Sequence, residues 1–128
     1  MAWRYCNRNK YGNTKTEVDG IIFDSAKEAR RWQELRLAER ADAIRDLRRQ
    51  VKYELIPAQR EPDQRGARGG VIKGKLLERA VYYTADFVYY DMAAGRTIAE
   101  DTKGFKTKDY IIKRKLMLYV HHIKIKEV

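Results

Sequence analysis

Two strand-like segments joined by a short loop constrain the fold of this chain more than any other part of its sequence. Residues 82–91 and 97–103 are rich in the aromatic and β-branched side chains that favour β-strands. Residues 92–95, Met-Ala-Ala-Gly, have the length of a hairpin loop. Counting back from that loop, one residue at a time on each strand, pairs Asp86 with Asp101.

The predicted pairing brings two like charges together. Side chains alternate across a strand, so Asp101 and Lys103 share one face of the hairpin, and Asp86 joins the face of its partner. Opposed carboxylates repel each other unless a cation or a proton lies between them. Ala85 and Phe87 are apolar and indicate strands that are partly buried, where a charge needs a partner. The pattern therefore favours a metal ion, although both aspartates could be ordinary solvent-facing charges.

Composition narrows the class of partner. The chain has 128 residues, with 28 Lys and Arg against 18 Asp and Glu, a net charge of +10 and a pI of about 9.8. This length suits one domain, residues 1–128, and the charge favours a polyanion, for which nucleic acid fits best. The longest apolar run, residues 116–120, is too short to span a bilayer, and no signal-peptide pattern opens the chain. We therefore expect a soluble, intracellular protein without a membrane partner.

Cysteine and histidine are too scarce to build a metal site. Cys6 is the single cysteine, which excludes an internal disulfide and a cysteine-based zinc site. His121 and His122 are neighbours in sequence and point in opposite directions if they lie on a strand. A metal site in this chain is therefore expected to use carboxylates.

The N-terminal half predicts a small β-ribbon and a helix. Residues 1–14 are basic without an apolar period and indicate a basic arm. Asp19-Gly20 is typical of a tight hairpin turn between two short strands. A helix is expected from residue 24 to about residue 43, because Ser25 and Glu28 match a capping box. Glu28 lies at the edge of the apolar stripe of that helix and is expected to point toward the sheet.

The middle of the chain predicts a strand, a loop and a second strand. Residues 51–58 suit a central strand that is stopped by a proline. Residues 59–75 are rich in glycine and basic residues and show no period, which favours a flexible basic loop. Such a loop could wrap a backbone phosphate, or it could be a solvated insertion. The next strand is expected over residues 76–90.

The C-terminal part predicts a helix and a closing strand. Thr107 suits the N-cap of a helix over residues 108–120. The helical spacing predicts a core stripe that consists of Ile112, Leu116, Tyr119 and Val120. Residues 123–126 alternate as an edge strand does.

The resulting order is helix, three strands, helix and strand, with an acidic residue on the first helix and an Asp-x-Lys motif on the third strand. In this order the chain resembles the PD-(D/E)XK nuclease superfamily, and within it a small phage-associated family of uncharacterised nuclease-like proteins. The resemblance spans nearly the whole chain. The matching motifs are Phe23-x-Ser25-x-x-Glu28, Tyr83-x-Ala85-Asp86-Phe87 and Glu100-Asp101-x-Lys103-Gly104. Ala85 stands where the superfamily name has a proline.

The resemblance implies an α/β fold with a restriction-endonuclease-like αβββαβ core, whose mixed sheet is flanked by helices, and a Mg²⁺-dependent endodeoxyribonuclease activity. Asp86 and Asp101 would then be metal ligands, Glu28 a further ligand from the helix, and Lys103 the group that positions or activates the attacking water. Mg²⁺ prefers hard oxygen ligands, so the backbone carbonyl of Thr102 is a further candidate, and Mn²⁺ is expected to substitute. For Glu28 the alternative is a purely capping role, and for Lys103 it is a salt bridge to one of the aspartates.

We further expect DNA as the partner, held by sequence-independent contacts. By analogy with the superfamily, the enzyme would select branched DNA such as a Holliday junction, act as a homodimer and work in the cytoplasm of a bacterial host if it is phage-encoded. Two alternatives remain, a basic nucleic-acid-binding protein without catalysis and a sequence-specific restriction- or homing-type nuclease. Cleavage of RNA and the number of metal ions stay open. The expected DNA contacts are Lys106, Lys108, Lys113, Arg65 and Arg68.

Overall fold

The central hairpin forms where the sequence predicts it. In the computed structural model, which describes residues 14–128, strand β8 (Val81–Asp91) pairs with the antiparallel strand β9 (Arg96–Asp101). Asp91 faces Arg96 at the loop, and the last pair of the ladder is Phe87 with Glu100. This confirms the predicted register, which places Asp86 and Asp101 one step beyond that pair. Except for Thr14, the basic arm expected at residues 1–14 lies outside the described residues.

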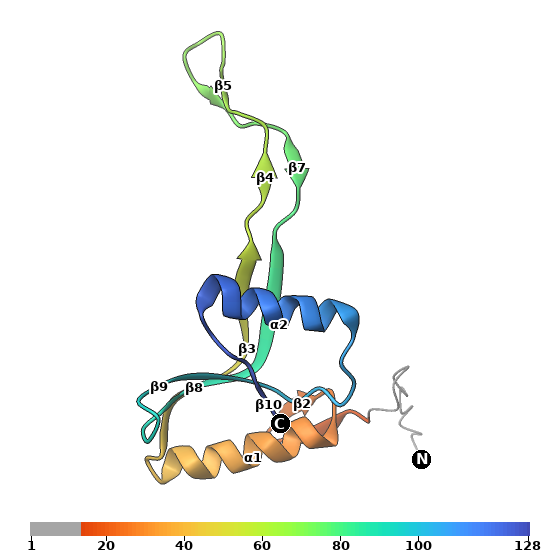
Figure 1. Cartoon of the computed structure of the whole chain (residues 1–128), viewed down its shortest axis with the longest axis vertical. Coiled ribbons are helices and arrows are strands. Elements are labelled where there is room, and N and C mark those ends of the chain that lie inside the picture. Colours follow the sequence, from red (N-terminus) through yellow and green to blue (C-terminus); the bar gives the residue numbers. More distant parts are fainter. Residues whose placement is uncertain (1–13) are drawn as a thin grey trace.

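The main sheet is mixed and has the strand order β10-β9-β8-β3. Strand β3 (Ile44–Ile56) is antiparallel to β8, and β10 (Lys126–Glu127) is parallel to β9 and lies at the edge. Helix α1 (Ala26–Arg40) precedes β3, and helix α2 (Lys108–His121) lies between β9 and β10 in sequence (Figure 1). The α/β class, the mixed sheet and the two helices of the prediction are confirmed.

Each helix covers its own face of the sheet. On one face Ala85 and Val88 pack in a cluster with Met117 of α2. On the other face Phe87 packs in a cluster with Trp32 of α1. In a regular strand the side chains of residues 85 and 87 would lie on the same face of the sheet. In β8 they lie on opposite faces, so the alternation of side chains is interrupted between them.

This change coincides with a bend of the β3–β8 hairpin at Asp86. Arg49 faces Phe87 and Val51 faces Ala85, so Gln50 lies beside Asp86 in the neighbouring strand. Gln50 has a φ of 50°, in the left-handed region that a non-glycine residue rarely adopts. Figure 1 shows that β3 and β8 change direction between the part that lies beside α2 and the part that lies beside β9. Asp86 is thereby placed where the two faces meet.

The predicted helix caps and the N-terminal ribbon are present. The Ser25 hydroxyl accepts a hydrogen bond from the Glu28 N–H at 3.1 Å, and the Thr107 hydroxyl accepts one from the Tyr110 N–H at 3.1 Å. Strands β1 (Thr16–Val18) and β2 (Ile21–Phe23) form the ribbon, whose turn includes Asp19 in the left-handed region.

The predicted core stripe of α2 is wrong at three of its four positions, and only Leu116 packs against the core. Tyr119 is 81% exposed and Ile112 is 56% exposed, and Val120 is also exposed, whereas Tyr110 and Met117 are buried. Apolar residues occur all around the C-terminal half of this helix, so their spacing does not show which side meets the sheet. No helix of the described part of the chain is long and apolar enough to cross a membrane.

Residues 57–80 differ from the expected loop and form a hairpin extension that projects from the sheet (Figure 1). It contains four short strands in two antiparallel pairs, β4 with β7 and β5 with β6. Both faces of these strands are exposed, so no hydrophobic period marks them in the sequence. The strand expected over residues 76–90 is accordingly divided into β7 and β8. The four short strands are β4 (Gln59–Arg60), β5 (Gln64–Arg65), β6 (Val71–Ile72) and β7 (Leu76–Glu78).

Candidate active site

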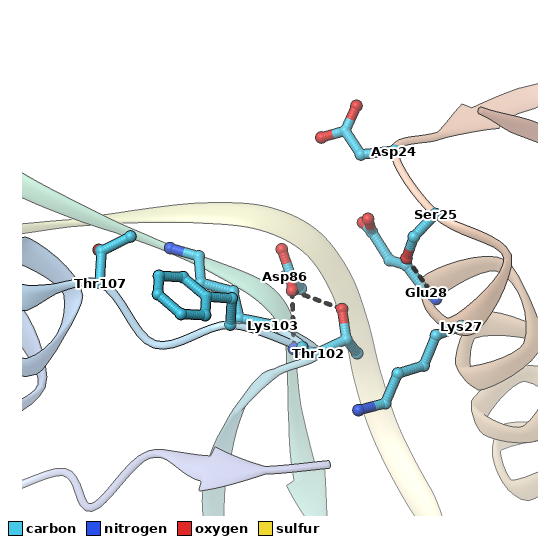
Figure 2. A pocket seen from close by; sticks show the side chains of 10 residues that line it. Asp24, Ser25, Lys27, Glu28, Asp86, Thr102, Lys103 and Thr107 are labelled. Atoms are coloured by element: carbon cyan, nitrogen blue, oxygen red, sulfur yellow. Dashed lines mark hydrogen bonds between the residues drawn. The ribbon is translucent and has the colours of Figure 1, made fainter. Parts of the chain in front are cut away.

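A cleft of about 400 Å³ opens between the N-terminus of α1 and the segment that joins β9 to α2. It brings together three of the predicted catalytic residues, Glu28, Asp86 and Lys103, from elements far apart in sequence (Figure 2). The full lining is Asp24, Ser25, Lys27, Glu28, Asp86, Thr102, Lys103, Gly104, Phe105 and Thr107.

Asp86 is held by three donors. Its Oδ2 accepts hydrogen bonds from the Thr102 N–H at 2.9 Å and from the Thr102 hydroxyl at 2.8 Å. Its Oδ1 accepts one from Nε2 of Gln50 at 3.3 Å, and the same Nε2 donates to Oε1 of Glu28 at 3.2 Å. One amide group thus links the two carboxylates. Thr102 orients Asp86 through its N–H and hydroxyl, and the role of its backbone carbonyl as a metal ligand stays a prediction.

Glu28 is a buried acid at a helix end. It is 4% exposed. Burial, followed by the charges of Asp86 and Asp24, raises the pKa of Glu28 from 4.5 to about 7, while the Arg49 guanidinium and a hydrogen bond from the Asp24 backbone oppose the rise. A carboxyl with such a pKa is partly protonated near neutral pH. A cation in the cleft would take the place of that proton.

Asp101 is buried and is not among the residues that line the cleft. The residue is 1% exposed, its Oδ2 accepts a hydrogen bond from the Tyr83 hydroxyl at 2.7 Å, and its Oδ1 accepts one from the Lys103 N–H at 2.9 Å. Burial raises the pKa of Asp101, the Tyr83 hydrogen bond opposes this, and the charge of Asp86 raises the pKa further.

The two aspartates therefore influence each other electrostatically but have no hydrogen-bond partner in common. Asp86 turns toward Thr102 and Gln50, and Asp101 turns toward Tyr83, which packs on the α2 face. The two carboxylates are thus held by different partners, and their joint binding of one metal ion stays a prediction.

Lys103 lines the cleft, and its amine lies over the ring of Tyr110. The residue is exposed, and its Nζ lies 4.9 Å from the centre of the Tyr110 ring. Among the ion pairs of residues 14–128, none joins Lys103 to Asp86 or Asp101. The alternative of a simple salt bridge is thus not what the structure shows.

The carboxylates of Glu28 and Asp86 are chemically suitable ligands for a divalent cation, but they do not form a complete coordination shell by themselves. Within residues 14–128, no group of three or more His, Cys, Asp and Glu side chains is arranged to hold a metal ion. Glu28 and Asp86 offer hard carboxylate oxygens, which Mg²⁺ prefers, and the Gln50 amide that links them stands where a shared cation would neutralise both.

The residues expected to contact DNA lie in two regions. Lys106 forms an ion pair with Glu127, and Arg114 bonds the same carboxylate at 2.8 Å. The Lys106 and Arg114 side chains lower the pKa of Glu127 to about 2, so Lys106 is already partnered. The other four are Lys108 and Lys113 on α2, and Arg65 and Arg68 on the hairpin extension.

Sequence reasoning missed two residues that shape the site. Gln50 carries no motif, and its left-handed conformation depends on tertiary packing. Tyr83 could have been found, because strand alternation places it on the same face as Ala85. The Tyr83 hydroxyl is the group that holds Asp101 in its buried position.

Comparison with known families gives one match. Residues 8–127 match the family model described as "Protein of unknown function (DUF1064)". No curated protein and no solved structure matches the chain.

Proposed function

Because the chain belongs to the DUF1064 family, whose function is unknown, we propose its function from the cleft: metal-dependent hydrolysis of DNA phosphodiester bonds by an endodeoxyribonuclease. The observation that carries the proposal is the convergence of Glu28, Asp86 and Lys103 on one cleft, in a chain of net charge +10. Burial, followed by the negative charges of Asp86 and Asp24, raises the pKa of Glu28 to about 7, and a cation bound beside it would favour the carboxylate.

Each residue of the cleft has a role in the proposed reaction. Glu28 and Asp86 would hold the cation, and the negative charge of Asp101, which acts on Asp86, would add to the attraction for it. A bound Mg²⁺ supplies acidification of a water molecule and neutralises charge on the phosphate. Lys103 donates hydrogen bonds to the attacking water or to a phosphate oxygen, where negative charge grows. Thr102 keeps Asp86 oriented through two hydrogen bonds.

The restriction-endonuclease-like core and the branched-DNA substrate belong to the same proposal. Supporting the core are the order of α1, β3, β8, β9, α2 and β10 and the register of the β8–β9 hairpin. The choice of branched DNA, and of a homodimer that makes paired cuts, rests on analogy with the superfamily.

A second candidate is a nucleic-acid-binding protein without catalysis. Both oxygens of Asp101 are engaged in internal hydrogen bonds, and the described residues contain no group of three metal-binding side chains. In this case the carboxylates would be structural, and the basic surface would do the work of the protein.

A cleavage panel separates the two candidates. Four-way, flapped, nicked and linear DNA are incubated with Mg²⁺ and with the wild type, Asp86→Asn or Lys103→Met, and Glu17→Gln on exposed β1 serves as the control. We expect Asp86→Asn and Lys103→Met to lose cleavage by at least about 100-fold, while both still bind DNA in EDTA. Binding without cleavage by the wild type would favour the second candidate. Discrete bands from long linear DNA would indicate a sequence-specific nuclease.

A further inference from the structure

The two strands of the hairpin extension (residues 57–80) approach each other closely near Gly74. The amide of Gly74 donates to Oδ1 of Asp63 at 2.8 Å, and the Glu61 N–H donates to the Lys75 carbonyl at 2.9 Å. A Cβ atom at Gly74 would lie 1.7 Å from the carbonyl oxygen of Glu61, so only glycine fits where the two strands approach. Strand β5 near the tip and helix α1 lie at opposite ends of the molecule's long axis (Figure 1).

Residues 64–75 of the hairpin extension contain four basic side chains and no acidic one, and the acidic Asp63 and Glu61 lie across the hairpin from Gly74 and Lys75. A surface of this kind attracts a polyanion. A second copy of this chain, with its own net charge of +10, would be repelled by it. The four basic residues are Arg65, Arg68, Lys73 and Lys75.

The same tip exposes aliphatic side chains. Val71 is 73% exposed and Ile72 is 58% exposed. In the β5–β6 ladder Arg65 faces Val71 and Gln64 faces Ile72, and cross-strand partners share a face. Each face of the tip therefore pairs one polar or cationic side chain with one exposed aliphatic side chain, where water alone would favour polar residues throughout.

We propose that the tip of the hairpin extension inserts into the minor groove of duplex DNA. Proteins that bind this groove combine Arg, Lys, Asn or Gln with apolar wedges, which unstack base steps and bend the duplex. In this chain Arg65 and Arg68 lie against the flanking phosphates, and Val71 and Ile72 are the wedge. The inference rests on DNA as the partner in the proposed function and adds the element that grips the duplex away from the cleft.

The test is DNA binding and bending by the full chain in EDTA, where no metal-dependent cleavage occurs. Anisotropy with a labelled duplex at several salt concentrations gives affinity and salt dependence, and energy transfer between dyes at the duplex ends gives bending. For Arg65→Ala/Arg68→Ala we expect affinity to fall by at least about tenfold and the slope of log K against log salt to shrink by about 1.8. For Val71→Ser/Ile72→Ser we expect bending to be lost, with a smaller fall in affinity.

Matched controls lie on α1 and β3, outside the hairpin extension. Leu37→Ser removes an aliphatic side chain that is 63% exposed, and Arg40→Ala/Arg45→Ala removes two exposed charges. Both should bind and bend DNA as the wild type does. Gly74→Ala provides a test that removes no charge, because the added Cβ forces the strands apart, and it should reduce bending.

The proposal is overturned if the Arg65/Arg68 and Val71/Ile72 variants bind and bend DNA as the wild type does, or if the wild type binds no DNA. Cleavage is scored separately in Mg²⁺. Binding that depends on the hairpin extension, in a protein that does not cut, would refute the nuclease and keep this inference. If the protein cleaves DNA and the substitutions in the hairpin extension do not change its DNA binding, the nuclease proposal is kept and this inference is refuted.

Discussion

The buried acid Glu28 makes the stability of this protein depend on pH, and Glu28→Gln should remove the part of that dependence that Glu28 contributes. Its pKa is raised from 4.5 to about 7 in the folded chain, so the folded state holds the proton more tightly than the unfolded state does. The contribution is fully present below pH 4.5 and is lost as the pH rises to about 7. A tenfold change in proton affinity is worth about 1.36 kcal/mol, and the loss therefore amounts to about 3 kcal/mol.

Glutamine keeps the backbone N–H that donates to the Ser25 hydroxyl and a side-chain oxygen that accepts from the Gln50 amide, but it carries no charge. Urea unfolding in EDTA at pH 5 and at pH 8 measures the effect. We expect the wild type to lose about 2.5 kcal/mol between these pH values, and Glu28→Gln to lose much less and to be the more stable protein at pH 8. Adding Mg²⁺ at pH 8 should stabilise the wild type and not the variant.

The control is Glu17→Gln on exposed β1, which should follow the wild type at both pH values. A Glu28→Gln protein with the pH dependence of the wild type would refute the reasoning, and so would a variant less stable than the wild type at pH 8.

Two further substitutions test the hydrogen bonds of two buried carboxylates. Tyr83→Phe removes the hydroxyl that donates to buried Asp101, and we expect a loss of about 1.5–3 kcal/mol in the free energy of unfolding, measured with urea. Glu100→Ala leaves Arg31 and Tyr89, which both bond this fully buried carboxylate, without their partner. Here we expect a loss of about 3–5 kcal/mol by the same assay, with cleavage per folded molecule unchanged because Glu100 does not line the cleft.

Each of these substitutions has a control of the same type. Tyr82→Phe changes an exposed tyrosine and should shift stability by less than about 0.5 kcal/mol. Glu34→Ala removes the surface partner of Arg31 and should cost less than about 1 kcal/mol. Equal losses in a variant and its control would show that the buried hydrogen bonds do not contribute as described.

The parts of the fold that follow from local rules were predictable from the sequence. The β8–β9 register follows from a four-residue loop and strand alternation, and the caps at Ser25 and Thr107 follow from side-chain chemistry next to the helix start. In both cases the interacting residues are close in sequence or are connected by a short turn.

The features that depend on packing between distant segments were not predictable. The bend at Asp86 requires the unusual conformation of Gln50 in the neighbouring strand, and it directs the carboxylates of Asp86 and Asp101 to different partners. The hairpin extension is exposed on both faces, so it lacks the period-2 pattern by which strands are recognised. In α2, the buried side became clear only from the contacts of Tyr110 and Met117.

The central claim is that Glu28 and Asp86 hold a divalent cation in the cleft. A crystal structure of the wild type grown with saturating Mn²⁺, with the anomalous signal used to locate the ion, tests this claim most directly. We predict one Mn²⁺ coordinated by carboxylate oxygens of Glu28 and Asp86, and no ion at this place in Asp86→Asn. A wild-type cleft without Mn²⁺ under conditions in which the protein cleaves DNA would contradict the account.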